Sequence, residues 1–429
     1  MQKDEILRRL RDPRLIPLKT QTLLLRVAAL AAELRVPCYL VGGVVRDLLL
    51  DRPVHESDID FVFEGDAIEF GYQLVKACGG KLTVHQKFRT AVWHAPEGGD
   101  LAPDTVDLIT ARREVYKRPG ALPTVTPAML IDDLRRRDFP VNAMAIRLDG
   151  GDSGELIDPL NGQGDLARNL IRVLHPASFL DDPTRIFRAL RYVARYGFTL
   201  EAETLQLINA EARAGLAQLS GERLRHEFDV TFEETNPSVT LQQFADLGLL
   251  EAIHPALLTA QCGFMPLETP STHFGEFTVP EILSVRQTLG WIFYLIELNE
   301  SDSAALAKRL AFPVALAEAV RSASILKRDL PSLKDYSPSQ WTFYLDEAPP
   351  LSIYAVYLAS RENALSEYLS KWRRVKPIAT GADLKMRGLR PGPHFGEILR
   401  RLRAAWLDEI VVNQEQEDRW LDSALNAQK

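Results

Sequence analysis

The stretch LVGGVVRDLLLDRPVHESDIDFVF, residues 40–63, sets a glycine pair and an Asp-Ile-Asp triplet within a largely apolar run. The residues up to the glycines predict a strand that ends in a turn, VVRDLLL predicts a short helix, and SDIDFVF predicts a second strand. Successive side chains of a strand point to opposite faces. We therefore expect Asp58 and Asp60 to project together from one face, while Ile59 and Phe61 face the core.

Two carboxylates that lie close together repel each other, and both stay ionised at neutral pH when a cation lies between them. Hard oxygen ligands with open coordination positions suit magnesium that is shared between protein and a phosphate substrate. The spacing of Asp58 and Asp60 therefore predicts a magnesium site. A third acid, Asp107, lies in the strand-like segment TVDLITA and is expected either to complete this cluster, as metal ligand or base, or to be an ordinary strand residue.

Gly42 and Gly43 allow the backbone to approach an anion closely, and the helix that follows offers free N–H groups to a phosphate. Arg46, one turn into that helix, adds a charged donor. The alternative is a simple glycine turn followed by two solvent-facing acids on an edge strand. Because both features fall within one strand–helix–strand unit, the sequence favours a nucleotide-phosphate site over this alternative.

The length of 429 residues exceeds that of one ordinary core, so two or more domains are expected. The chain is 46% hydrophobic and 25% charged, as soluble globular proteins are. No apolar run reaches the length of a membrane span, and the three cysteines lie too far apart to indicate a disulfide framework or a zinc site. These features predict a cytoplasmic protein with no membrane partner.

The net charge of −7 argues weakly against a nucleic-acid partner, but binding depends on where the cations cluster. Basic residues do cluster, within residues 112–118, 135–137 and 185–195.

Between Cys38 and about Ile146 the patterns alternate between strand and helix. DAIEFGYQLVKACGG predicts a helix, whereas KLTVH, TAVWHA and TVDLITA predict strands; REVYKRPGALPTVTPA predicts a loop because of its three prolines and its glycine. Beyond about Asp181 the periodicity is helical, and no strands are expected. The predicted fold class is α+β, with a mixed head at residues 1–150, a helical neck at 151–235, and a helical body and tail at 236–429.

The segment DDPTRIFRALRYVARYGF predicts a helix with two distinct stripes. The stripe expected to face the core comprises Ile186, Phe187, Leu190, Val193 and Ala194, and the other comprises Arg185, Arg188, Arg191 and Arg195. Four like charges on one stripe repel, so we expect them to meet an anion such as a triphosphate or RNA. The alternative is pairing with acids on neighbouring helices.

GGVVRD followed by DID resembles the signature of polymerase-β-like nucleotidyltransferases. The later blocks DLRRRDFPVNAMAI, LIDPLNGQGDLARNLIRVL, FLDDPTRIFRALRYVARYGF and GERLRHEF resemble, in order, class II tRNA nucleotidyltransferases and bacterial poly(A) polymerases. The resemblance implies template-independent addition of nucleotides to the 3′ end of tRNA. It implies ATP and CTP as substrates, two magnesium ions, and helical body and tail domains that bind the tRNA acceptor stem and elbow.

The resemblance also implies site residues. Asp58, Asp60 and Asp107 would be catalytic, Asp58 and Asp60 as magnesium ligands. Asp182 and Arg185 would select the base, because a carboxylate accepts from an exocyclic amine and a guanidinium donates to a ring nitrogen. Cytosine and adenine present that pair of groups, whereas guanine and uracil reverse it. The residues implied to bind the nucleotide are Gly42, Gly43, Arg46, Arg137, Asp182, Arg185, Arg188 and Arg191.

Two alternatives remain open for these residues. Asp182 precedes Pro183, an arrangement typical of a helix start, so capping is a competing role for its carboxylate. Pro140 stands where relatives commonly have threonine, which removes one backbone donor beside the RRRDF arginines.

Several activities stay open within the family. Full CCA addition and addition of the terminal A alone are not distinguished by the sequence. Addition of CC alone is disfavoured, since a loop follows the third acid, and poly(A) tailing is disfavoured by the acidic composition. A different class of function, a non-catalytic RNA- or nucleotide-binding protein, is disfavoured because both strand acids are present.

Overall fold

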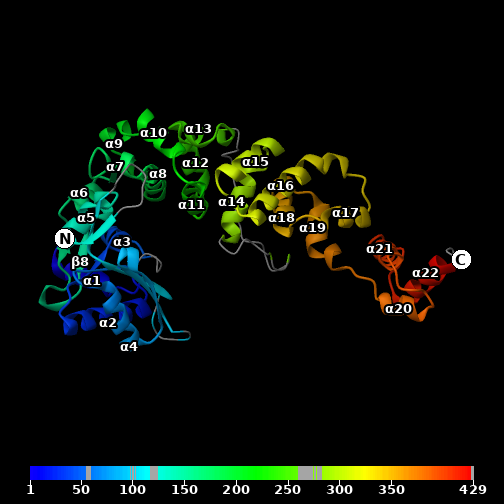
Figure 1. The fold of residues 1–429 in the computed structure, drawn as a ribbon, viewed down its shortest axis with the longest axis horizontal. Helices are drawn as coiled ribbons and strands as arrows, with labels where there is room; N and C mark the ends of the chain where they lie inside the picture. Colours follow the sequence, from blue (N-terminus) through cyan, green and yellow to red (C-terminus); the bar gives the residue numbers. More distant parts are fainter. Residues whose placement is uncertain are drawn as a thin grey trace. The chain divides into compact units, whose positions relative to one another are not determined.

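The computed structural model describes residues 1–54, 59–96, 98, 101, 103–115, 124–258, 274, 277 and 283–426. The chain forms two compact units, Met1–Leu219 and Ser220–Lys429. Among the described residues, the strands lie in the first unit and the second unit is built from helices (Figure 1). The predicted fold class, a mixed α+β head followed by helices, is confirmed. The finer division at residues 150 and 235 stays a prediction, and residues 151–219 pack in the same unit as the head.

The first unit combines a sheet with short helices (Figure 1). Its helices are α1 (Lys3–Leu10), α2 (Leu18–Leu34), α3 (Gly43–Leu49), α4 (Ala67–Cys78), α5 (Leu130–Arg135), α6 (Gly162–Ala167), α7 (Ser178–Asp181), α8 (Thr184–Tyr196), α9 (Ala202–Gln206) and α10 (Ala210–Ala217). Its strands are β1 (Cys38–Val41), β2 (Asp60–Phe63), β3 (Lys81–His85), β4 (Thr90–His94), β5 (Thr105–Thr110), β6 (Arg112–Val115), β7 (Thr124–Pro127), β8 (Ala145–Arg147), β9 (Leu156–Ile157), β10 (Leu170–Ile171) and β11 (Thr199–Leu200).

The main sheet has seven strands in the order β3-β4-β5-β2-β1-β8-β9. Strand β2 lies at its centre, antiparallel to β1 and parallel to β5. Ile59 and Phe61 are 2% and 0% exposed, so both side chains face the core as predicted. Helix α4 packs on β3, β4 and β5, and its first turn is capped by Asp66, whose carboxylate accepts from the backbone N–H groups of Ile68 and Glu69.

The sequence prediction was wrong at the ends of the segment REVYKRPGALPTVTPA. Strands β6 and β7 form an antiparallel pair there, with Glu114 opposite Val125. Thr124, Val125 and Thr126 are β-branched residues that favour a strand, and this preference outweighed the turn signals from the neighbouring prolines. The centre of the predicted loop, residues 116–123, lies outside the described residues.

The prediction of no strands beyond Asp181 was also wrong in one place. Strand β11 pairs in parallel with β10 through Leu170–Thr199 and Ile171–Leu200. A strand of two residues is too short to show a period in the sequence.

The second unit consists of α11 (Gly221–Phe232), α12 (Pro237–Asp246), α13 (Leu249–Ile253), α14 (Val285–Leu295), α15 (Glu300–Arg309), α16 (Val314–Asp329), α17 (Pro338–Leu345), α18 (Pro350–Ser360), α19 (Asn363–Ser370), α20 (Gly381–Met386), α21 (His394–Leu407) and α22 (Gln414–Asn426). Its core includes Phe228 and Phe232, which both contact Trp291 with ring centroids 5.2 Å apart. The indole N–H of Trp291 donates to the buried Asp229 at 2.6 Å. Within the described residues, no helix combines the length and apolar character that a bilayer span requires.

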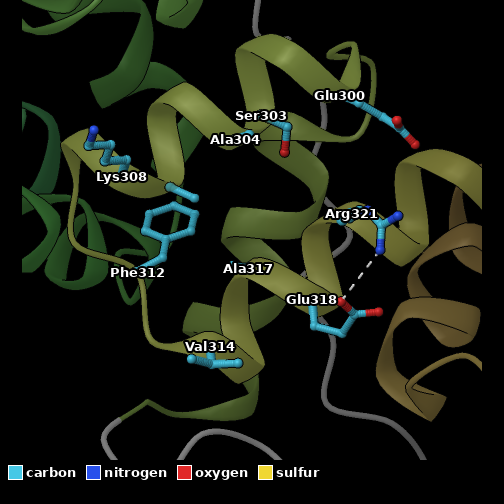
Figure 2. A pocket seen from close by; sticks show the side chains of 10 residues that line it. Glu300, Ser303, Ala304, Lys308, Phe312, Val314, Ala317, Glu318 and Arg321 are labelled. Carbon is cyan, nitrogen blue, oxygen red and sulfur yellow. Dashed lines mark ion pairs between the residues drawn. The ribbon is translucent and has the colours of Figure 1, made fainter.

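A hollow of about 610 Å³ lies between α15 and α16 in the second unit (Figure 2). Apolar side chains, among them Phe312 and Val314, line much of it, and Glu318 forms an ion pair with Arg321 at 3.8 Å. None of the residues predicted to form the active site lines this hollow.

Candidate active site

Asp60 and Asp107 are neighbours on adjacent strands. In the parallel pair of β2 and β5 they are register partners, and on its other side Asp60 is opposite Val41 of β1. Register partners on adjacent strands direct their side chains to the same face of the sheet. The two carboxylates therefore share one face at the start of β2, although 47 residues separate them in the sequence.

The two acids differ in exposure. Asp60 is half-buried, whereas Asp107 is exposed. Even so, partial desolvation by the surrounding protein raises the pKa of the Asp107 carboxyl above its ordinary value. The positive charge of His85 acts in the opposite direction and reduces this rise. A carboxylate with a raised pKa is a better proton acceptor than an ordinary one, which suits the base role predicted for Asp107.

Gly42 lies directly beside Asp60. Its φ is +78°, in the left-handed region, and a Cβ placed there would lie 3.0 Å from Nη1 of Arg137 and 3.8 Å from Oδ2 of Asp60. Gly42 immediately precedes helix α3, so the turn, the guanidinium and the carboxylate occupy one small region. The sequence placed Gly42 and Arg137 in the nucleotide site separately, and the structure brings them together.

Replacing Gly42 with alanine is expected to destabilise the chain by about 1–2 kcal/mol and to raise the KM for nucleotide about tenfold, because alanine resists this φ and its Cβ displaces Arg137. Gly150→Ala is the matched control, since Gly150 has φ +65° with open space around it. Denaturant unfolding and nucleotide KM would be measured for both. An equal rise in KM for the two variants would contradict the placement of Gly42 in the site.

Arg137 is held by Asp133, with its Nη2 3.2 Å from Oδ2 of that carboxylate. Asp133 is fully buried and also binds Arg136 at 2.6 Å. The Nε of Arg137 is buried and has no hydrogen-bond acceptor within the described parts of the chain. The guanidinium as a whole places a positive charge beside Gly42, which suits an anionic ligand.

Arg46 differs from the exposed phosphate donor that the sequence suggests. It is 2% exposed, and three of its nitrogens donate to other side chains: Nε and Nη2 to Asp47, at 2.9 and 3.0 Å, and Nη1 to Asn142 at 2.7 Å. The guanidinium therefore joins helix α3, which follows the glycine turn, to Asn142. Direct contact of Arg46 with a phosphate stays a prediction.

Arg188 forms an ion pair with Asp138, through Nε at 2.8 Å and Nη2 at 2.6 Å. The other carboxylate oxygen of Asp138 accepts from the backbone N–H of Phe139 and from Asn142. Burial opposes ionisation of Asp138, but the charge of Arg188 and the hydrogen bonds from Asn142 and Arg188 outweigh it, so the pKa of Asp138 is lowered. For Arg188, pairing with a neighbouring acid is the arrangement the structure shows.

Asp138→Asn is expected to cost on the order of 2 kcal/mol at pH 7, because Asn leaves the Arg188 charge without its buried partner. Since the folded pKa lies below the ordinary 3.8, this stabilisation is present above pH 3.8 and is lost as pH falls through the folded pKa. The difference in unfolding free energy between wild type and variant is therefore constant from pH 7 to about pH 4 and shrinks below it. Denaturant titrations across this range measure it.

The control for this prediction is Asp132→Asn, which removes a surface ion pair with Arg113. That change is expected to cost less than about 1 kcal/mol at every pH. A difference for Asp138→Asn that grows on acidification would contradict the assignment.

Asp182 and Arg185 flank the start of α8. One carboxylate oxygen of Asp182 accepts from the backbone N–H of Thr184 at 3.1 Å and from its hydroxyl at 2.8 Å, so the capping role is observed. Arg185 is 7% exposed and donates to the hydroxyl of Ser178 and to the carbonyl oxygen of Arg136. Base selection by this pair stays a prediction, and capping by one oxygen is compatible with it.

Part of the predicted arginine stripe of α8 is buried in the protein and does not lie on its surface. Arg185 and Arg191 are 7% and 5% exposed, whereas Arg195 is exposed. On the apolar stripe, Ile186, Phe187 and Leu190 are buried as predicted, and Val193 and Ala194 are half-buried.

The predicted metal site is described only in part. Asp58 lies outside the described residues, and strand β2 begins at Asp60. Among the residues that the structure does describe, no group of three or more acidic, histidine or cysteine side chains could hold a metal ion. Asp60 with Asp107 supplies hard carboxylate oxygens on one face, which fits magnesium, and the contribution of Asp58 stays a prediction.

Comparison with known proteins identifies the family. A family model described as the poly A polymerase head domain matches residues 38–172, and one described as a probable RNA and SrmB-binding site of polymerase A matches residues 197–260. The chain is 34% identical to an A-adding tRNA nucleotidyltransferase of Halalkalibacterium halodurans over 401 residues, which covers 92% of this chain and 90% of that protein. The chain belongs to the tRNA nucleotidyltransferase family.

Other members of the tRNA nucleotidyltransferase family agree in fold. An A-adding tRNA nucleotidyltransferase of Geobacter sulfurreducens is 33% identical over 94% of this chain, which spans 47% of that protein's length. A CCA-adding enzyme in an apo form matches with TM-score 0.75 and 28% identity, covering 99% of each chain. The Thermotoga maritima CCA-adding enzyme complexed with tRNA matches with TM-score 0.68 and 28% identity, covering 98% of each chain. The family predicted from the sequence motifs is therefore confirmed.

The sequence motifs did not predict four residues that lie around the site arginines of this tRNA nucleotidyltransferase: Asp138, Asn142, Tyr192 and Tyr196. They surround Arg46 and Arg188 through hydrogen bonds and ring contacts. The signal that could have found the first two is polarity at buried positions, because DFPVNAMAI reads as an apolar segment interrupted by Asp138 and Asn142, which are 7% and 5% exposed. The tyrosines gave no comparable signal, since aromatic residues on a helix usually belong to the core.

Proposed function

We propose that this chain transfers AMP from ATP to the 3′ end of tRNA that ends in CC. The observation that carries the proposal is the pairing of Asp60 with Asp107 beside Gly42 and Arg137. Paired acids next to a backbone turn and a guanidinium are the groups that nucleotidyl transfer requires: one set to hold the nucleotide and one to activate a hydroxyl.

In the proposed reaction the 3′-hydroxyl oxygen of the tRNA attacks the α-phosphorus of ATP. The bond between that phosphorus and the oxygen that bridges to the β-phosphate breaks, and pyrophosphate leaves. Asp107 accepts the proton of the attacking hydroxyl. Gly42, Gly43 and Arg137 bind the triphosphate, with Arg188 and Arg191 from α8, and Arg46 positions the glycine turn.

Asp60 and Asp58 are the residues proposed to hold magnesium, as two ions. Bound magnesium would neutralise the triphosphate and lower the pKa of the hydroxyl. We place the tRNA on the helical second unit, and the Thermotoga maritima relative complexed with tRNA supports tRNA as the partner. The proposed location is the cytoplasm, where tRNA is processed.

Adenine is the proposed base because three relatives at 33–34% identity are A-adding enzymes. Asp182 and Arg185 would accept the edges of adenine and cytosine and leave a buried group unpaired against guanine and uracil, at a cost of about 1–3 kcal/mol for each wrong edge. Full CCA addition is the second candidate. It is favoured by the CCA-adding relatives of known structure, which match over almost the whole chain.

The test offers purified chain, magnesium and each labelled nucleotide to tRNAs that end before CCA, after C, or after CC. The proposal expects AMP on the tRNA that ends in CC and no CMP on the shorter ones. CMP incorporation on the shortest tRNA would establish full CCA addition instead. Long A tracts would overturn both tRNA candidates, and the lack of any incorporation would leave only a binding function.

A further inference from the structure

Helix α3 and helix α8 meet at Arg46. Its guanidinium carbon lies 5.1 Å from the ring centroid of Tyr192 and 4.6 Å from that of Tyr196, and both rings come from α8. The two rings are themselves 6.1 Å apart, at an interplanar angle of 48°. Both distances are within cation–π range, so the guanidinium of Arg46 on α3 contacts two aromatic rings of α8. We call Arg46, Tyr192 and Tyr196 the arginine clamp.

A hydrogen bond between Tyr196 and Asp47 is a further link between α8 and α3. The hydroxyl of Tyr196 donates to Oδ1 of Asp47 at 3.0 Å, and that oxygen also accepts from Nε of Arg46. Arg46 and Asp47 are 2% and 6% exposed, so these bonds form with little competition from water. Loss of the Tyr196 hydroxyl would therefore affect the carboxylate that orients Arg46.

The clamp continues into a buried polar chain. Asn142 accepts from Arg46 and donates to Asp138, and Asp138 accepts from Arg188 of α8. Arg46 is thus joined to α8 twice, through the two rings and through Asn142 and Asp138. The contacts lie within the first unit, and each consists of described residues.

These contacts join α3 to α8, and both helices adjoin residues that the proposed reaction uses. Helix α3 follows the turn of Gly42, which lies beside Arg137 and Asp60. Helix α8 begins two residues after Asp182 and carries Arg185 in its first turn. We propose that Tyr196, with Tyr192, is a positioning residue that fixes the phosphate-binding turn relative to the base-selecting helix. This inference rests on the proposed function, because the turn and the helix bind the two ends of the nucleotide only if that proposal holds.

Tyr192 and Tyr196 are not among the residues proposed to contact the substrate, and this determines how the loss of either ring should appear. A misplaced turn weakens binding of the ground state and of the transition state alike, so the KM rises while kcat changes little. A loosened distance between the two nucleotide-binding regions should also lower the discrimination of ATP against other nucleotides. A purely structural tyrosine would lower the stability and leave both quantities unchanged in the folded enzyme.

Two substitutions separate the ring from the hydroxyl. Tyr196→Phe keeps the ring over Arg46 and removes the donor to Asp47, whereas Tyr196→Leu removes both. We expect the KM for ATP to rise about threefold in the Phe variant and about tenfold in the Leu variant, with kcat within about twofold of wild type. Misincorporation of GMP relative to AMP is expected to rise in the same order.

The matched control is Tyr72→Leu, on α4 of the same unit, where the side chain is 54% exposed. It should leave the KM and the discrimination at wild-type values. Kinetics would be measured well below the unfolding midpoint of each variant. A Leu variant with a lowered midpoint but a wild-type KM would overturn the proposal.

Equilibrium binding of ATP to wild type and to the Tyr196→Phe variant completes the test. This measurement needs no turnover, so it remains decisive if the wild type incorporates no nucleotide, which would itself overturn only the proposed function. If the Leu variant does not fold, weaker ATP binding by the folded Phe variant supports the clamp. Equal binding by the Phe variant and wild type in that case would overturn it.

Discussion

Asp60→Asn is expected to lower kcat for AMP transfer by about 10³-fold or more while the chain stays folded. Asp60 is half-buried at the start of β2, opposite Val41 and Asp107 in the sheet, and its Oδ2 lies close to the turn of Gly42. Asparagine has the size of aspartate without its charge, so we expect the fold to survive and the proposed metal-binding carboxylate to be lost. Rapid-quench measurement of AMP incorporation at saturating ATP, with circular dichroism to verify folding, measures this effect.

Asp104→Asn is the control for this substitution, because Asp104 is exposed and immediately precedes β5. Its kcat should match that of wild type. An Asp60→Asn variant that retains more than about a tenth of wild-type kcat would remove Asp60 from the catalytic centre, since loss of a metal-binding carboxylate is expected to cost far more.

Asp107→Asn is expected to lower kcat about 10²-fold and to leave the KM for ATP within about twofold. A proton acceptor acts only in the transition state, and asparagine cannot take a proton at neutral pH. Asp107 shares a face with Asp60 and is exposed, so the substitution does not disturb the core. Steady-state kinetics with a tRNA that ends in CC separates the two constants.

A change in the KM without a change in kcat, or no change in either, would give Asp107 a different role. A large rise in the KM with unchanged kcat would make Asp107 a binding residue, and an unchanged variant would make it an ordinary strand residue. Asp104→Asn serves again as the control, because it removes an exposed carboxylate three residues away along the chain.

Much of the first unit could be predicted from the sequence, because its signals are local. The glycine pair, the alternation around Asp60 and the apolar strands each depend on a few neighbouring residues. Even the meeting of Asp60 and Asp107 was foreseen as one option, since both lie on predicted strands. The choice between the options required the order and register of the sheet, which a single sequence does not specify.

The environment of the arginines could not be predicted for a similar reason. A helical wheel shows which residues of α8 share a stripe, but it does not show that Arg188 and Arg185 each have a partner in a distant segment. Arg188 meets Asp138 and Arg185 meets the carbonyl of Arg136, and both partners lie about 50 residues earlier in the chain. The burial of Arg46 under two tyrosines depends in the same way on the packing of α8 against α3.

A crystal structure of the chain with magnesium and a non-hydrolysable ATP analogue would show directly whether Asp60, Gly42 and Arg137 form the nucleotide site. We expect a metal ion bound by the Asp60 carboxylate, the triphosphate over the turn of Gly42 with Arg137 in contact, and the adenine at the start of α8. A triphosphate bound away from this turn, with Asp60 and Asp107 beyond reach of both metal and phosphate, would contradict this expectation.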